Sequence, residues 1–188
     1  GIESIVVDDR SRDAIESTIR AGILEQGTVE ALTQTGASDR VLTEGHRHDG
    51  IELRFGEHGR DHQGHRIDFA DLVGRGVWLY PQHEVLKDLI ARRLADGGDL
   101  RFGWAASGVL DGDSAAPRIV GIADDGEGFE IIADFVVGAD GSRSIAREAV
   151  TGSQTGGHFR EYPFAWFGIL CEAPPSAPEL IYSASEDG

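Results

Sequence analysis

The sequence predicts an α/β fold with a second β-sheet inserted into it, and three patterns support this class. Residues 4–7, Ser-Ile-Val-Val, are an apolar β-branched run that ends on two carboxylates, which is typical of a buried parallel strand. Residues 82–96 carry the clearest amphipathic helix, and two glycines end it. The run DDGEG joins two apolar segments and predicts a hairpin.

The remaining elements alternate in type along the chain. In order, the patterns predict short helices within 20–36, a hairpin of 48–56 with 65–69, a strand over 77–82, strands over 118–123 and 129–139, a helix over 142–150, and strands over 162–172 and 179–184. The apolar residues of the first of these are Ile23, Leu24, Val29 and Leu32, with Gly36 at the end. The apolar face of the 82–96 helix comprises Val85, Leu86, Leu89, Ile90 and Leu94.

Composition excludes several classes of function. The 188 residues include 17 Lys and Arg against 33 Asp and Glu, a formal net charge of −16, so nucleic acids and anionic membranes would be repelled. No apolar run reaches the roughly 18 residues of a membrane span, and no signal segment opens the chain. The single cysteine, Cys171, cannot form an internal disulfide and reads as a packed side chain. We therefore expect a cytoplasmic protein.

Asp8 closes the first predicted strand and is the first candidate site residue. In a dinucleotide-binding βαβ unit the second strand ends on an acidic residue, about 20 residues after a glycine-rich turn, and this residue binds the adenosine ribose. That turn would precede residue 1. The alternative is an ordinary solvated carboxylate at a strand end.

A second candidate segment, FVVGADGSRSIAREAV, covers residues 135–150. It runs from an apolar strand through Gly138, Asp140 and Gly141 into a helix that carries Arg143 and Arg147. Glycines allow close approach of a ligand, and a helix N-terminus favours phosphate. The alternative is an ordinary strand-turn-helix in which Asp140 serves only as an N-cap.

The run DGSRSIAR resembles the Asp-Gly motif of the class A flavoprotein aromatic hydroxylases, where it contacts FAD and the nicotinamide cofactor. The segments RAGILEQGTVEAL, YPQHEV, YPFAWFGIL and ELIY, in this order, resemble the members that hydroxylate 4-hydroxybenzoate. The similarity extends over the chain from residue 1 to its end. It implies a Rossmann-like FAD-binding domain interleaved with a β-sheet substrate domain, NAD(P)H and O2 as co-substrates, and a homodimer.

The resemblance gives cofactor-binding roles to particular positions. It assigns Asp8 to the FAD ribose, although the family usually has Glu there. Arg20 matches an arginine near the FAD pyrophosphate, and Arg147 one implicated in NAD(P)H binding. The other implied cofactor contacts are Gln82 and Asp140, together with the flavin-lining stretch Thr18, Ile19, Arg20, Ala21, Gly22 and Ile23.

The resemblance also implies a phenol-binding pair. Tyr182, in ELIY, matches the tyrosine that hydrogen-bonds the substrate phenol, and His48 matches the histidine that ends a proton relay to solvent. Removing the phenolic proton makes the ring electron-rich at the ortho carbon, and a histidine titrates near neutrality. From the residues alone, Tyr182 would read as core and His48 as part of a solvated loop. We predict no metal site from His46, His48, His58, His62 and His65, because a metal needs convergent ligands.

Asp9 departs from the family pattern. Members that prefer NADPH tend to carry arginine at this position, whereas this chain has a carboxylate followed by Arg10. A carboxylate should repel a 2′-phosphate. We therefore expect NADH to serve at least as well as NADPH.

The resemblance further implies that the chain is an interior fragment. We expect residues 1–70 to be part of the FAD-binding domain with the start of the inserted sheet, 71–150 to be FAD-binding domain with a hairpin and the Asp-Gly motif, and 151–188 to begin the substrate sheet. The first strand with its glycine turn and the C-terminal part would be missing, so the fragment alone would be inactive. Two alternatives stay open: another class A phenol hydroxylase, and a non-catalytic remnant or one half of a split protein that pairs through an exposed sheet edge.

Overall fold

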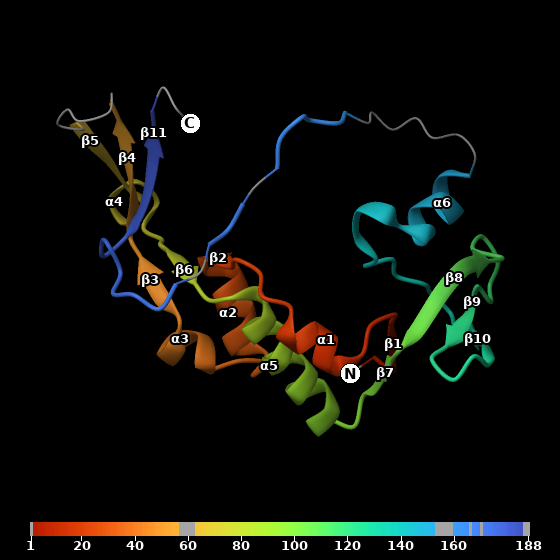
Figure 1. Ribbon diagram of the computed structural model, residues 1–188. Helices are drawn as coiled ribbons and strands as arrows, with labels where there is room; N and C mark the ends of the chain where they lie inside the picture. Colours follow the sequence, from red (N-terminus) through yellow and green to blue (C-terminus); the bar gives the residue numbers. More distant parts are fainter. Residues whose placement is uncertain (1, 57–62, 153–159, 166, 170, 186–188) are drawn as a thin grey trace. The chain divides into compact units, whose positions relative to one another are not determined.

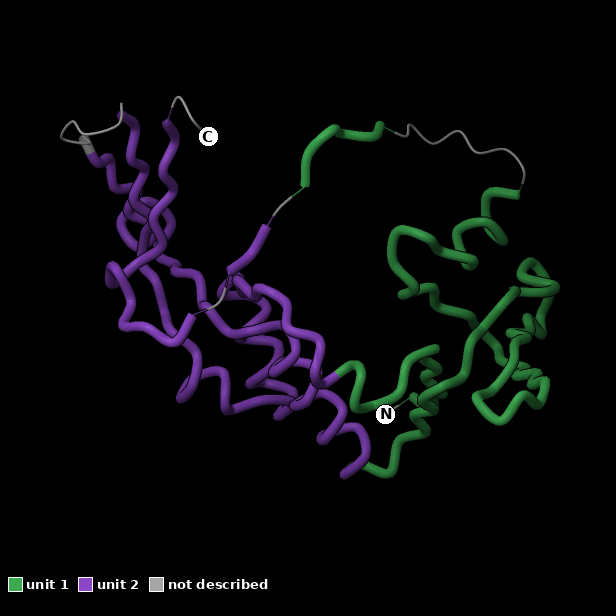
Figure 2. The backbone as a smooth tube through the Cα atoms, in the orientation of Figure 1, with its two compact units in different colours: residues 1–15, 96–166 green, residues 16–95, 167–188 purple. Residues whose placement is uncertain are grey.

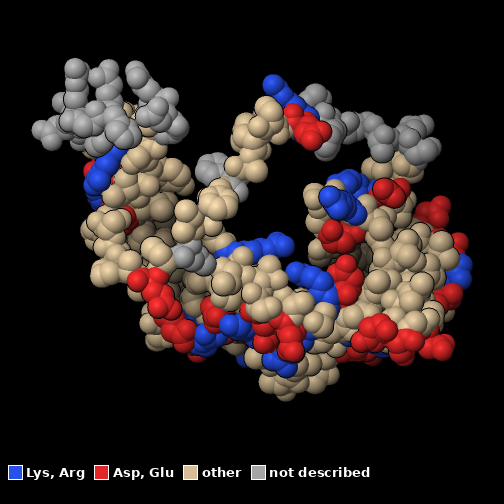
Figure 3. Space-filling view, viewed as in Figure 1, with Lys and Arg blue, Asp and Glu red and all other residues tan. Residues whose placement is uncertain are grey.

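The computed structural model describes residues 2–56, 63–152, 160–165, 167–169 and 171–185. They form two compact units, residues 1–15 with 96–166 and residues 16–95 with 167–188 (Figure 2). Helices and strands are mixed throughout the chain (Figure 1), which confirms the predicted α/β class. Acidic side chains are spread over the visible faces of both units (Figure 3), in line with the net charge of −16.

A parallel strand pair begins unit 1. β1 (Ile5–Asp8) pairs in parallel with β7 (Asp99–Phe102), so the predicted first strand is present. The prediction that it is buried is wrong, since Ile5 is 42% and Val6 45% exposed. Among the described residues β1 has a neighbouring strand on one side only, which leaves its other edge open. The short helix α1 (Arg12–Ser17) follows it.

Three antiparallel strands form the second sheet of unit 1. They are β8 (Trp104–Leu110), β9 (Arg118–Ala123) and β10 (Gly128–Ile132), and the last two are the predicted hairpin. The strand predicted to continue to residue 139 ends at Ile132 instead. Phe135 and Val137 are each 86% exposed, because no strand of the described residues pairs with them.

The segment after Asp140 is a broken helix rather than the single one predicted. A 3₁₀ turn, η1 (Gly141–Arg143), precedes α6 (Ile145–Thr151), which contacts β8. The break follows from two backbone features. Gly141 has a φ of 74°, and Ser144 is extended and caps α6 by accepting a hydrogen bond from the N–H of Arg147.

Unit 2 contains an antiparallel sheet in the order β2-β6-β3. Its strands are β2 (Ile23–Glu25), β6 (Val77–Leu79) and β3 (His46–His48). Ile23 and Leu24 therefore lie in a strand and not in the predicted helix, which begins later as α2 (Gln26–Gln34). Gly36, with a φ of 64°, follows the end of that helix as predicted.

The second sheet of unit 2 has the order β11-β4-β5. The predicted hairpin is formed by β4 (Gly50–Phe55) and β5 (Gln63–Asp68), with α4 (Phe69–Val73) after it. β11 (Leu180–Ala184) confirms the strand predicted over 179–184 and runs parallel to β4. The strand predicted over 162–172 is absent from the described residues of that segment.

The buried core of unit 2 lies between its first sheet and its helices. Val29, Val41 and Tyr80 are its most buried side chains. Besides α2, the helices α3 (Arg40–Glu44) and α5 (Gln82–Ala95) contribute side chains to this core. The predicted apolar face of α5 is partly wrong, since Leu89 and Leu94 are each 41% exposed. In their place α5 buries Asp88 beside Ile90. None of the helices formed by the described residues has the length and apolar content that a membrane crossing requires.

Candidate functional site

Residues 20–22, just before β2, run alongside residues 80–82, which lead into α5. The N–H of Tyr80 donates to the carbonyl oxygen of Gly22 over 3.1 Å, and the N–H of Gln82 donates to that of Arg20 over 3.4 Å. Gly22 makes this approach possible, because a Cβ there would lie 2.1 Å from the Tyr80 carbonyl oxygen and 2.7 Å from the Gln82 nitrogen. The structure therefore brings Arg20, Gly22 and Gln82 together, as one edge of unit 2. We call residues 20–22 with 80–82 the Arg20–Gln82 edge.

The side chains on this edge are open to solvent. Thr18, Ala21 and Gln82 are exposed, and Ile19 and Ile23 are 62% and 49% exposed. Arg20 is exposed as well, and its guanidinium forms no hydrogen bond or ion pair within the described part of the chain. Gln82 begins the 14-residue helix α5, whose N-terminal N–H groups carry partial positive charge. The edge therefore combines a free cation with a helix N-terminus, an arrangement that suits a phosphate group.

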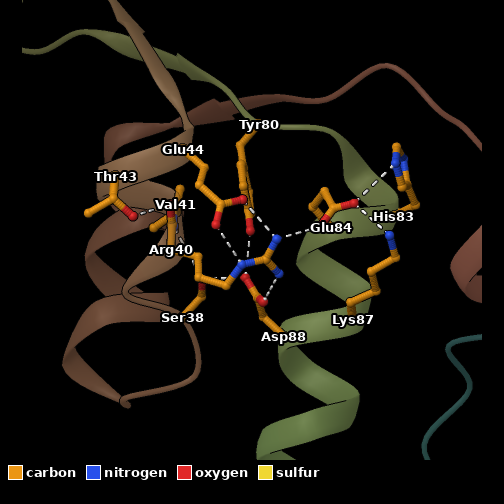
Figure 4. Close-up of polar contacts among 10 residues, drawn as sticks. All are labelled: Ser38, Arg40, Val41, Thr43, Glu44, Tyr80, His83, Glu84, Lys87 and Asp88. Atoms are coloured by element: carbon orange, nitrogen blue, oxygen red, sulfur yellow. Dashed lines mark hydrogen bonds and ion pairs between the residues drawn. The ribbon is translucent and has the colours of Figure 1, made fainter.

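Tyr80, one of the residues of this edge, belongs to a polar network with buried members (Figure 4). The Tyr80 hydroxyl donates to Oδ2 of Asp88 over 2.7 Å, and the Ser38 hydroxyl donates to the same oxygen over 2.5 Å. The three side chains are 1%, 7% and 4% exposed, in the order Tyr80, Asp88, Ser38. Burial, and then the Asp88 carboxylate, raise the pKa of the Tyr80 hydroxyl far above its usual value. Tyr80 is therefore a neutral hydrogen-bond donor.

Arg40 connects this network to solvent. Its guanidinium donates to Oδ1 of Asp88 over 2.6 Å, to Glu84 over 2.7 Å and to Glu44 over 2.8 Å. Hydrogen bonds from Lys87 and, with a smaller effect, from Arg40 lower the pKa of the Glu84 carboxyl. None of these residues is among the predicted site residues. Asp88 was the signal that could have revealed the network, because an acidic residue on the apolar face of a helix needs a buried partner.

His48 is joined to the strand that carries Tyr182. The N–H of Leu180 donates to Nδ1 of His48 over 3.1 Å, and the imidazole is 8% exposed. An Nδ1 that accepts a hydrogen bond fixes the neutral ring as the tautomer protonated at Nε2. His48 is therefore buried against β11, which corrects the solvated-loop reading. Tyr182 is 49% exposed, which corrects its reading as core.

Tyr182 and His48 are not in direct contact. The Tyr182 hydroxyl has no hydrogen-bond partner among the described residues, and in the register of the two parallel strands Tyr182 lies opposite Leu53. The side chain is thus open to a ligand. A proton relay from this hydroxyl to the imidazole would need intervening groups such as water.

An ion-paired carboxylate lies beside His48. Arg66 donates from Nε and Nη2 to the two oxygens of Glu179, over 2.7 and 2.9 Å, and the N–H of Asp49 donates to the same carboxylate over 3.0 Å. The hydrogen bonds from Arg66 are the main reason why the pKa of the Glu179 carboxyl lies below its usual value. Glu179 precedes β11, so this carboxylate ties the start of β11 to β5.

Asp8 lies at the end of β1 in unit 1, and its carboxylate is occupied by Arg10. Asp8 accepts hydrogen bonds from the backbone N–H of Arg10 over 2.9 Å and from its guanidinium Nε over 3.2 Å. The Asp9 carboxylate points to solvent, with 73% of its side chain exposed, and lies 4.0 Å from the same guanidinium. The turn after β1 therefore presents two carboxylates and one arginine.

Asp140 organises the turn before α6. Its carboxylate accepts hydrogen bonds from the Ser144 hydroxyl over 2.6 Å and from the N–H of Ala146 over 3.2 Å. The bond from Ser144 has the larger effect in lowering the pKa of the Asp140 carboxyl. The guanidinium of Arg147 donates to the carbonyl oxygen of Ser142 over 2.7 Å. Ser144, not Asp140, is the side-chain cap of α6. Among the described residues, no hydrogen bond or ion pair joins Asp8 to either Asp140 or Arg147.

A cavity of about 300 Å³ lies in unit 2 between the start of α2 and α4. Phe69, Val73, Arg75 and Val77 are among its lining residues, and none of the predicted site residues is. Within the part of the chain that the structure describes, no group of three or more His, Cys, Asp or Glu side chains is placed to hold a metal ion. His58 and His62 lie outside the described residues.

Comparison with known proteins supplies the remaining findings. A family model described as FAD binding domain matches residues 1–188. The chain is 36% identical, over 189 aligned residues, to p-hydroxybenzoate hydroxylase of Acinetobacter baylyi; the match covers 100% of this chain and 45% of that protein. The chain thus spans less than half the length of this relative.

Two solved structures share the fold. The flavin-dependent monooxygenase PieE, solved with FAD and substrate, has a TM-score of 0.62 and 22% identity, and the match covers 79% of this chain and 28% of PieE. PqsL of P. aeruginosa, solved with 2-aminobenzoylacetate, has a TM-score of 0.60 and 20% identity over 85% of this chain and 41% of PqsL.

Proposed function

Because the chain belongs to the FAD-binding domain family, we propose that the protein encoded by its complete reading frame is a flavoprotein monooxygenase that hydroxylates 4-hydroxybenzoate. The reaction would consume O2 and NAD(P)H and yield 3,4-dihydroxybenzoate, oxidised nicotinamide cofactor and water. The likeness to the A. baylyi hydroxylase over the entire chain carries this proposal. All the residues for which we predict a role lie within the matched stretch.

Each unit, taken by itself, offers side chains that would suit one part of FAD. At the Arg20–Gln82 edge the exposed guanidinium of Arg20 and the N-terminus of α5 would bind the pyrophosphate. Asp8 would accept the ribose hydroxyl hydrogen bonds, after its guanidinium partner on Arg10 shifts or shares the carboxylate. Asp140 and Arg147 would serve the flavin and the nicotinamide cofactor from the turn before α6.

When bound, FAD supplies the redox chemistry, since it accepts hydride from NAD(P)H and then activates O2. The protein supplies orientation of the phenol and movement of its proton. Tyr182, whose hydroxyl is free within the described residues, would hydrogen-bond the phenol oxygen. Withdrawal of the phenolic proton enriches the ortho carbon in electrons, and that carbon is the position hydroxylated.

His48 would pass that proton to solvent. In its neutral form the ring carries hydrogen at Nε2, and Nδ1 accepts from the N–H of Leu180. A proton that arrives at the neutral ring must bind at Nδ1, so it displaces the N–H of Leu180. Proton uptake by His48 would therefore be coupled to the first residue of β11, the strand that carries Tyr182.

The test is product analysis with the protein expressed from the complete reading frame. It is incubated with FAD, NADH, O2 and 4-hydroxybenzoate, and the products are separated by liquid chromatography. We expect 3,4-dihydroxybenzoate in a one-to-one ratio with NADH consumed. NADH oxidation that yields only hydrogen peroxide with 4-hydroxybenzoate, but a hydroxylated product with another phenol, would instead support a class A hydroxylase of different specificity.

A second candidate function is that of a partner-binding half of a split protein. The open edge of β1 and the exposed Phe135 and Val137 favour it, since each could accept a strand from another chain. Size-exclusion chromatography of this chain with a fragment that carries a GxGxxG strand-turn-helix would show a complex. In-frame stop codons close to both ends of this segment would support the same reading over the monooxygenase.

A further inference from the structure

The structure assigns to Tyr80 and Asp88 a positioning role toward the flavin-binding edge: through one buried hydrogen bond they set the position of Gln82 and of the Arg20–Gly22 backbone. This inference rests on the proposed function, because it concerns the same edge. Neither residue is exposed enough to touch a cofactor, since Tyr80 is 1% and Asp88 7% exposed. Their action on a ligand would be indirect.

Tyr80 is held from two directions. Its backbone N–H donates to the carbonyl oxygen of Gly22, and its hydroxyl donates to Oδ2 of Asp88, six residues after Gln82 on α5 (Figure 4). The residue is thus bonded to the partner segment at its backbone and to α5 at the tip of its ring. If the hydroxyl loses its bond to Asp88, the whole residue can shift, and its backbone leads through Pro81 to Gln82.

Asp88 is fixed in turn by residues on the α3 side. Ser38 donates to the same oxygen, and Arg40 donates to the other one over 2.6 Å. Arg40 also binds Glu84, one turn earlier on α5. The orientation of the first two turns of α5 is therefore determined by hydrogen bonds with defined directions, which apolar contacts alone would leave less specific.

A charged group inside the core is a costly way to obtain stability. An apolar replacement of similar volume is often as stable as a buried ion pair, and Val29 and Val41 already supply apolar contact here. What the polar arrangement adds is a single geometry for the turn at residues 80–82. The exposed Arg20 and Gln82 need that geometry if they are to meet one ligand together.

The experiment compares three hydroxyl deletions in the protein expressed from the complete reading frame, after removal of FAD. Tyr80→Phe deletes the donor on the edge side of Asp88. Ser38→Ala deletes the donor to the same oxygen on the α3 side. Thr43→Val deletes an exposed hydroxyl that bonds the Arg40 carbonyl oxygen. FAD affinity is measured by fluorescence titration, the flavin absorption spectrum is recorded, and the Tm of each FAD-free protein is measured separately.

We expect Tyr80→Phe to raise the Kd for FAD about tenfold, the size of one lost buried hydrogen bond, and to shift the flavin spectrum. Ser38→Ala keeps the bonds of Tyr80 and Arg40 to Asp88, so it should lower the Tm while it leaves the Kd within about twofold. Thr43→Val should change neither. A wild-type Kd in Tyr80→Phe would overturn the inference. So would an equal rise in Kd for Ser38→Ala, because stability alone would then explain both effects.

A measurement on the unsubstituted protein does not depend on the folding of any variant. Amide hydrogen exchange should protect the N–H groups of residues 80 and 82 as strongly as those in the middle of α5. Exchange of these two amides at the rate of an open loop would overturn the inference. Failure of the unsubstituted protein to bind FAD at all would instead overturn the proposed function, and this inference with it.

Discussion

The N–H of Leu180 donates a hydrogen bond to Nδ1 of His48, over 3.1 Å. This bond links the end of β3 to the first residue of β11. It gives the imidazole a structural task besides the proton relay that we propose. The two tasks can be separated by substitution, because only the relay needs a group that titrates.

His48→Asn should keep the structural task and lose the relay. The side-chain oxygen of asparagine can accept from the N–H of Leu180 as Nδ1 does, whereas His48→Phe leaves that donor unpaired. We expect His48→Phe to lower the free energy of unfolding by about 1–3 kcal/mol, and His48→Asn by less. Urea denaturation measures both. Equal losses in the two variants would show that the Leu180 bond does not matter.

The same two variants should behave alike in catalysis. Both lack an imidazole that could accept the proton, so both should deprotonate the phenol less readily in the enzyme-substrate complex. The absorbance of bound 4-hydroxybenzoate, followed against pH, reports this step. A wild-type pH profile in His48→Asn would exclude His48 from the relay.

Gly22→Ala should disrupt the Arg20–Gln82 edge. Its Cβ would lie 2.1 Å from the Tyr80 carbonyl oxygen, so the two segments must separate, and we expect FAD affinity to fall by at least about tenfold. Gly27→Ala is the matched control. A Cβ at Gly27 meets nothing within 4 Å, and alanine in α2 should stabilise the protein by up to about 1 kcal/mol. FAD titration and thermal unfolding compare the two; equal FAD affinities would contradict the role of the edge.

Asp9→Arg should change the preference between nicotinamide cofactors. The Asp9 side chain is 73% exposed and the neighbouring Arg10 guanidinium is bonded to Asp8, so the unsubstituted protein presents negative charge to a 2′-phosphate. We expect kcat/KM for NADH at least equal to that for NADPH, and the substitution should raise the NADPH to NADH ratio by about tenfold. A strong NADPH preference before substitution would contradict this account.

In Glu179→Gln the free energy of unfolding should decrease less steeply as the pH is lowered. Arg66 lowers the pKa of the Glu179 carboxyl in the folded protein from an ordinary value of 4.5. A lowered pKa in the folded state gives stability that is present above the unfolded value and is lost as the pH falls through the folded value. We expect the urea midpoint to fall less steeply in Glu179→Gln than in the unsubstituted protein below about pH 5. Glu127→Gln, on the β9–β10 turn, is the control and should retain the full acid dependence.

The sequence predicted correctly those elements that a local residue pattern is enough to specify. The first strand, the 48–69 hairpin and the extent of α5 are local patterns, and the structure confirms them. The 135–137 and 162–172 segments are equally apolar but form no strand in their described residues. A strand needs a neighbour, and none of the described strands pairs with either segment.

The candidate site shows the same division. The family resemblance drew attention to Arg20, Gly22 and Gln82, and the structure places their backbones side by side. The sequence analysis did not identify Asp88 as a site residue, because its contact with Ser38, fifty residues away in the sequence, and with Tyr80 arises only in the folded chain. The exposure of Tyr182 and the burial of His48 were read the wrong way from the residues alone, since burial depends on which strands become neighbours.

The most direct test of the central claim is the anaerobic reduction of bound flavin. The protein expressed from the complete reading frame is loaded with FAD and mixed rapidly with NADH, with and without 4-hydroxybenzoate, while the flavin absorbance is followed. In the function we propose, substrate binding controls when the flavin is reduced. We therefore predict stoichiometric flavin and a reduction rate that rises by at least about tenfold when 4-hydroxybenzoate is present. Protein without flavin, or a reduction rate unaffected by 4-hydroxybenzoate, would contradict the account.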